Sequence, residues 1–231
     1  MRQLLDTPQT EVARPLEGIL PKPLMRGWLH ALAAVGAVVL TLLLCWRSWG
    51  DGPRLLSLLV FGLTMVELYT VSAVYHIGRW SEPLRRRLRA LDHANIFLLI
   101  AGTYTPLCFN VLSGWLRPTI LATIWVLAAF GVGLATLTLH APRWVGAVLY
   151  VAMGWVSALA IPAFAQALGG PAVLTLLLGG VLYTIGAVIY ALKWPNPFPR
   201  IFGFHEVFHL FVIGGSLAFA AAIWIWAVPL L

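Results

Sequence analysis

Long apolar runs separated by short polar connections dominate this sequence of 231 residues. Seven of the runs are about 20 residues long, which is the length of helix that crosses a bilayer. They cover roughly residues 28–47, 55–77, 91–112, 116–138, 143–163, 171–192 and 206–228. None of them alternates apolar and polar positions as the strands of a β-barrel do. The pattern therefore predicts an all-α fold, an integral membrane bundle of seven transmembrane helices.

The composition agrees with a lipid environment, because 61% of the residues are apolar and only 10% are charged. A water-soluble domain of this size could not bury so much apolar surface. We expect two parts: a polar cytoplasmic tail over residues 1–25 and one membrane domain over residues 26–231. The first part contains no apolar segment of the kind that a cleavable signal peptide needs.

The net charge of +7 would suggest a nucleic-acid partner in a soluble protein, but its placement suggests a membrane instead. Twelve of the 15 Lys and Arg residues fall on the side of the predicted bundle that holds the N-terminus. The positive-inside rule then predicts a cytoplasmic N-terminus and an outside C-terminus. The basic run from Arg85 to Arg89 is expected to anchor this topology and to meet anionic lipid headgroups. Membrane lipids, and no nucleic acid, are therefore the expected partners.

The last apolar run opens on the stretch His205-Glu206-Val207-Phe208-His209, which fits the H-E-x-x-H pattern of zinc proteases. Residues four apart lie on one side of a helix, so both imidazoles can reach one ion. A zinc protease of this type takes its third ligand from beyond the motif, yet no Asp, Glu, His or Cys follows His209. A third ligand must therefore come from upstream, which disfavours the protease interpretation.

Upstream candidates lie at the same predicted depth. Ser72 and His76 are four residues apart near the end of the second run, and Asp92 stands near the start of the third. Counting residues from the opposite ends of their runs places His76 at about the level of His209. Three neutral imidazoles, His76, His205 and His209, suit Zn²⁺ and leave a fourth position open, as in catalytic zinc sites. Asp92 could orient or deprotonate a water there, and Ser72 could bond Asp92 or an oxyanion.

Other polar residues are more ambiguous. Glu206 follows His205 by about 100° around the helix, so it faces the site, another helix or the headgroups. Taken singly, His30, His93 and His140 are expected to be hydrogen-bonded core residues, and His93 is also a candidate accessory residue of the site, as is Glu206. Glu67 is expected to be a buried carboxylate with either an interhelical hydrogen bond or a proton or substrate role.

Four short motifs carry a resemblance to a known family. "SAVYH" contains Ser72 and His76, "LDHANI" contains Asp92, "AGTYTP" follows it, and "HEVFH" contains the last two histidines. Their combination and order resemble the hemolysin III family of bacterial membrane proteins, which is related to the progestin and adipoQ receptors and more distantly to alkaline ceramidases. "RGWLH", from Arg26 to His30, resembles the bacterial branch, since only its His matches the E-x-x-N-x-x-x-H element of the eukaryotic receptors.

The resemblance implies a seven-helix bundle in the bacterial cytoplasmic membrane, with zinc near the cytoplasmic face held by His76, His205 and His209. It also implies that Asp92 and Ser72 lie close to the metal, and it marks Tyr104, in "AGTYTP", as an accessory residue without an assigned role. The leading hypothesis is a zinc-dependent hydrolase of a lipid amide or ester. The alternative is a membrane-active haemolysin, or a receptor-like regulator of membrane lipid homeostasis, with structural zinc. Haem bound by two histidines is a third hypothesis.

Overall fold

A computed structural model describes residues 23–137 and 142–229, so His140 lies outside the described part of the chain. The helices are α1 (Trp28–Arg47), α2 (Gly52–Ile77), α3 (Glu82–Val111), α4 (Leu116–Leu137), α5 (Arg143–Gly154), α6 (Ile161–Leu168), α7 (Gly170–Leu192) and α8 (Phe204–Ala222). A 3₁₀ segment, Trp155–Ala160, joins α5 to α6, and a π-helical turn, Ile223–Ala227, extends α8.

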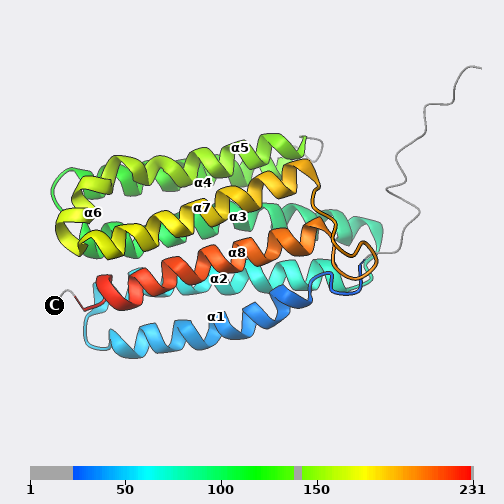
Figure 1. Cartoon of the computed structure of the whole chain (residues 1–231). Coiled ribbons are helices and arrows are strands. Elements are labelled where there is room, and N and C mark those ends of the chain that lie inside the picture. The colour runs from blue at the N-terminus through cyan, green and yellow to red at the C-terminus, as the bar shows by residue number, and fades with distance from the viewer. Residues whose placement is uncertain (1–22, 138–141, 230–231) are drawn as a thin grey trace, which may run out of the picture.

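The helices lie side by side with their long axes roughly parallel (Figure 1). Helices α1 to α4 pack in chain order, α7 packs on α8, and α8 returns to α1. Seven spans within the described residues are long and apolar enough to cross a membrane, with α5, the 3₁₀ segment and α6 together forming the fifth. Helices satisfy their own backbone hydrogen bonds in lipid. The predicted seven-helix membrane bundle is therefore confirmed.

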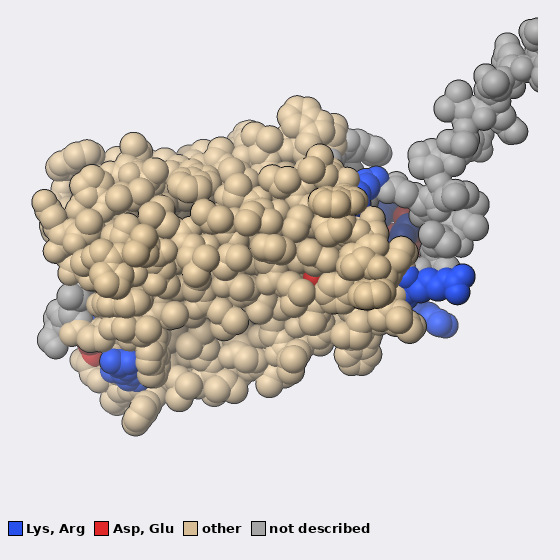
Figure 2. Space-filling view, viewed as in Figure 1, with Lys and Arg blue, Asp and Glu red and all other residues tan. Residues whose placement is uncertain are grey.

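Charged side chains gather at the two ends of the bundle, and the face between them is almost free of blue and red (Figure 2). This is the distribution expected of a protein whose middle contacts lipid tails. Helix α3 begins at Glu82, well before the predicted start at 91. The arginine-rich turn is helical but too polar to be part of an apolar run, so hydropathy marks the buried span and misses the start of the helix.

The fifth span is interrupted at the 3₁₀ segment, and Tyr104 of α3 supports the interruption. Its hydroxyl donates to the carbonyl of Gly154 at 2.6 Å and accepts from the backbone N–H of Ser157 at 2.6 Å. Tyr104 is 7% exposed. A buried hydroxyl that serves two backbone groups replaces helical hydrogen bonds lost at the break. The structure thus gives Tyr104 a contact that stabilises the fold.

The segment before α1 is fastened to the connection between α7 and α8. The backbone N–H groups of Leu24 and Met25 donate to the carbonyls of Arg200 and Ile201, both at 3.1 Å. In Figure 1 these two segments meet at one end of the bundle. Residues 23–27 are therefore held against the start of α8, where two of the predicted ligands lie.

Candidate metal centre

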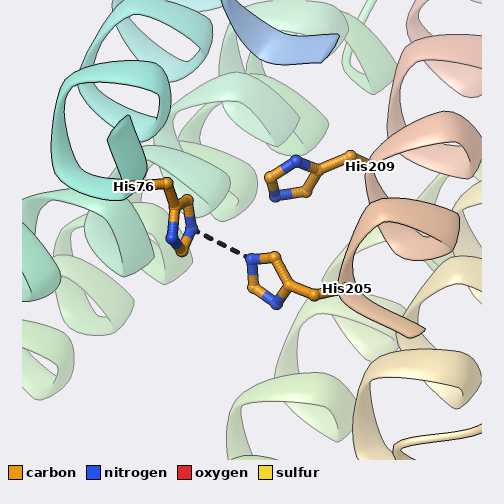
Figure 3. Close-up of side chains that lie close together, drawn as sticks. All are labelled: His76, His205 and His209. Atoms are coloured by element: carbon orange, nitrogen blue, oxygen red, sulfur yellow. Dashed lines mark hydrogen bonds between the residues drawn. The ribbon is translucent and has the colours of Figure 1, made fainter. Parts of the chain in front are cut away.

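Three histidines from two helices converge at one end of the bundle. His76 is in the last turn of α2, whereas His205 and His209 are in the first two turns of α8. One ring nitrogen from each lies within 4.8 Å of the other two, and Figure 3 shows the three rings turned toward one another. The Nε2 atoms of His76 and His205 are 2.9 Å apart. All three residues are buried, with exposed fractions of 9%, 8% and 1%.

The cluster suits a metal ion of the zinc type. Three nitrogens that each lie about 2.05 Å from a tetrahedral ion would be about 3.3 Å apart, a value between the 2.9 Å that separates His76 from His205 and the 4.8 Å limit for the set. The buried Nδ1 of His209 has no hydrogen-bond partner among the described residues, and a bound ligand would remove the cost of such a polar atom in an apolar environment. Among the described residues, three imidazoles form the group that could hold an ion, which matches the ligand count of a zinc site with an open position.

Asp92 borders the cluster from the third helix. Its Oδ2 atom is 3.7 Å from Nε2 of His76, and its side chain is 14% exposed. The hydroxyl of Ser72, one turn before His76 on α2, hydrogen-bonds the Asp92 carboxylate. Ser72 is 2% exposed. The structure therefore brings together the five residues that the sequence singled out, with the carboxylate beside one imidazole and held by a hydroxyl.

Glu206 is fully buried but is engaged elsewhere. One carboxylate oxygen forms an ion pair with Nε of Arg26, and the other accepts the backbone N–H of Gly203 at 2.7 Å. Gly203 precedes α8, so Glu206 caps the helix that carries two of the histidines. The sequence left three directions open for Glu206: the site, another helix or the headgroups. The structure shows it in contact with another segment of the protein. The partner, Arg26, belongs to the segment fastened over the start of α8.

His93 lies next to Asp92 and belongs to a different hydrogen-bond set. Its Nδ1 is 2.8 Å from the carbonyl of Arg89, and its Nε2 is 3.0 Å from the hydroxyl of Tyr190. A carbonyl can only accept, so in the neutral ring Nδ1 carries the proton and Nε2 accepts from Tyr190. Tyr190 in turn lies near His205, with ring centroids 6.0 Å apart. His93 therefore ties α3 to α7 beside the cluster.

Two expectations change with the structure. The apolar run around Glu67 predicts a buried carboxylate, but Glu67 is exposed on the outer face of α2. It is nine residues from His76, which corresponds to two and a half turns, so it projects from the opposite side of the helix. His30 is expected to have hydrogen-bond partners, but neither of its ring nitrogens has one among the described residues. Its ring instead stacks on that of His209, with centroids 3.6 Å apart.

A cavity extends from His205 and His209 into the bundle. Along α3 it is lined from Asp92 to Leu107, which corresponds to about 22 Å of helix. Most of the remaining lining is aliphatic or aromatic, including Phe164, Val173 and Phe219. The lipid chains of one leaflet fill about half of a hydrocarbon core of about 30 Å. The cavity is thus apolar and long enough for an acyl chain, and it carries imidazoles and a carboxylate at one end.

The fold and the cluster define a class of protein: a seven-helix integral membrane protein with a histidine site at one end of its bundle. Residues 19–220 match the family described as haemolysin-III related, and the chain belongs to this family. It is 31% identical to "Hemolysin-3 homolog" of Bacillus subtilis (strain 168), covering 81% of this chain and 84% of that protein. It is 33% identical to "Hemolysin-3" of Bacillus cereus, covering 81% of this chain and 83% of that protein. A human relative, "Monocyte to macrophage differentiation factor", is 27% identical, covering 84% of this chain and 80% of that protein.

Proposed function

We propose that this protein is a zinc-dependent hydrolase of a lipid amide or ester, acting near the cytoplasmic face of a bacterial inner membrane. The observation that carries the proposal is the position of the histidine cluster. Three buried imidazoles and a carboxylate meet at the end of an apolar cavity about 22 Å long. Such a cavity suits an acyl chain, and its polar end is where a scissile carbonyl would lie.

The residues present can divide the reaction among them. His76, His205 and His209 would hold the ion. Zinc bound there would supply Lewis acidity, which polarises a carbonyl and makes water acidic enough to act as a nucleophile near neutral pH. Asp92 would take a proton from the water as the water oxygen bonds to the carbonyl carbon. The same carboxyl group would then give that proton to the leaving nitrogen or oxygen as the bond to the carbonyl breaks.

Ser72 has a supporting role in this proposal. Its hydroxyl bonds the Asp92 carboxylate, which would hold that group beside His76 while the proton is transferred. The exposed arginines 85–87 and 89 at the start of α3 would bind anionic lipid headgroups. They also agree with a cytoplasmic N-terminus and an outside C-terminus under the positive-inside rule.

Metal analysis of purified protein, combined with a lipid screen, tests the proposal. We expect about one zinc ion per chain, which His76→Ala and His205→Ala should lose. Asp92→Asn should keep the zinc and lose turnover by about 10²- to 10⁴-fold. Cells that carry Asp92→Asn should then accumulate the substrate lipid. Wild-type protein without stoichiometric zinc, or His205→Ala protein with full metal, would refute the zinc site.

A second function is suggested by the names of two relatives, "Hemolysin-3 homolog" and "Hemolysin-3". In this alternative the protein is a membrane-active haemolysin or a receptor-like regulator of lipid homeostasis, and its zinc is structural. Asp92→Asn separates the two functions because it leaves the three imidazoles intact. A phenotype that survives this substitution supports the alternative, and one that disappears while zinc is retained supports the hydrolase.

A further inference from the structure

His30 is the fourth histidine at the metal centre. It is the third residue of α1 and is 2% exposed. Its ring lies on that of His209 with 3.6 Å between centroids and 12° between planes, and the ring of Tyr69 is 5.0 Å away. Both ring nitrogens are without a hydrogen-bond partner among residues 23–137 and 142–229. His30 also lines the apolar cavity.

Stacking alone does not account for an imidazole at this position. A phenyl ring would pack on His209 equally well and would have no polar atoms to satisfy. A buried donor or acceptor without a partner costs about 1–3 kcal/mol, and buried polar groups in proteins nearly always have partners. The His30 imidazole therefore calls for a polar group that reaches it through the cavity.

The geometry argues that this group is not the metal ion. The rings of His30 and His209 are nearly parallel at a stacking distance, so His30 presents the face of its ring, and not a nitrogen lone pair, to His209. The nitrogens of His30 are also outside the set of mutually close ligand atoms. His30 would therefore not be one of the residues that hold the ion.

We propose that His30 is a substrate-binding residue that hydrogen-bonds the polar end of the lipid whose chain fills the cavity. The inference rests on the proposed function for the position of the scissile group. Neutral imidazole offers one donor and one acceptor, so His30 suits a ligand with a carbonyl or hydroxyl oxygen next to the metal. Asp92 lies beside His76, and His30 lies beside His209. The reacting group of the lipid would therefore meet one polar side chain next to each of these two proposed metal ligands.

Two probes and two variants test the role of His30. Hexadecanoyl hydroxamic acid has a zinc-binding group, an acyl chain for the cavity and oxygens that can hydrogen-bond His30. Hexadecanethiol has a zinc-binding group and a chain but no such oxygen. His30→Phe keeps an aromatic ring against His209. Thr41→Val is the control, because it removes a buried hydroxyl from α1 at a position outside the cavity lining. Zinc content and probe affinity are measured by metal analysis and by calorimetry in one detergent.

We expect His30→Phe to retain zinc, to bind the hydroxamate about tenfold more weakly and to bind the thiol as the wild type does. Thr41→Val should bind both probes normally. Loss of zinc in His30→Phe, an equal loss of affinity for both probes, or an unchanged affinity for the hydroxamate would overturn the assignment. Protein that shows the expected probe pattern but hydrolyses no lipid would refute the hydrolase and leave the binding role of His30 standing.

Discussion

The ion pair between Arg26 and Glu206 should be the contact at the metal end whose loss costs most. Glu206 is 0% exposed and the Arg26 side chain is 20% exposed. Arg26→Met removes the charge, keeps much of the chain length and leaves the Glu206 carboxylate with the hydrogen bond from the Gly203 N–H. Removing one member of a buried pair costs about 3–5 kcal/mol, since the other charge stays desolvated. The partial exposure of Arg26 favours the lower end, about 3 kcal/mol.

For a chain of this size, 1 kcal/mol corresponds to about 2–4 °C in melting temperature, so Arg26→Met should melt about 6–12 °C below wild type. Thermal unfolding in detergent, followed by tryptophan fluorescence, measures the shift. Zinc content should fall as well, because Glu206 directly follows His205 and caps α8. Arg85→Met is the matched control, since the Arg85–Glu82 pair is more than half exposed on both sides and such pairs contribute little.

The double variant Arg26→Met/Glu206→Gln separates charge from packing. It buries no unpaired charge, and the glutamine oxygen can still accept the N–H of Gly203. We therefore expect it to recover most of the lost melting temperature. A single variant that melts within about 2 °C of wild type would refute the reasoning. A double variant no more stable than the single one would assign the loss to the packing of the arginine side chain.

Three further changes test the fold itself. Tyr104→Phe should lower the stability by about 1–2 kcal/mol, because the Ser157 N–H at the break in the fifth span loses its partner and the Gly154 carbonyl keeps only the Ser157 hydroxyl; an unchanged melting temperature would contradict this. Gly62→Ala would place a Cβ 2.3 Å from Oγ1 of Thr41 and should lower the stability by about 1–3 kcal/mol. The double variant Gly62→Ala/Thr41→Ala should recover part of that stability; no recovery would mean that the helices already tolerate the methyl group. Glu67→Leu should raise the yield of inserted protein, since a central acidic residue on a lipid-facing surface opposes insertion by about 3 kcal/mol; a lower yield would indicate that a partner covers this face.

The spans and the relative depths of the cluster residues are predictable from the sequence, for identifiable physical reasons. Bilayer thickness sets the length of each apolar run, and the helical rise converts residue counts into depth. Residue counting alone therefore places His76 and His209 at one level. The four-residue spacing of His205 and His209 likewise puts both on one side of α8. These features depend on geometry within a single helix.

Features that depend on the rotation of one helix against another are not predictable in this way. The apolar run around Glu67 suggests a position inside the bundle, but only the packing of α2 decides which side of that helix faces lipid. The stacking of His30 on His209 requires the rotation of α1 relative to α8. The support that Tyr104 gives to Gly154 joins residues on different helices. The depth of His30, at the start of the first run, is the one signal in the sequence that could have linked it to the cluster.

The start of α1 gives a physical meaning to "RGWLH", the motif that lacks most of the eukaryotic receptor pattern. Arg26 pairs with the carboxylate that follows the first histidine of α8. Gly27 has φ +87°, and a Cβ there would lie 2.9 Å from Cβ of His76, so only glycine allows this approach. His30 stacks on His209. This short motif thus contacts the surroundings of all three proposed ligands. Substitutions in it should therefore change metal occupancy before they change the insertion of the helix, because Arg26, Gly27 and His30 contact residues of both ligand-bearing helices.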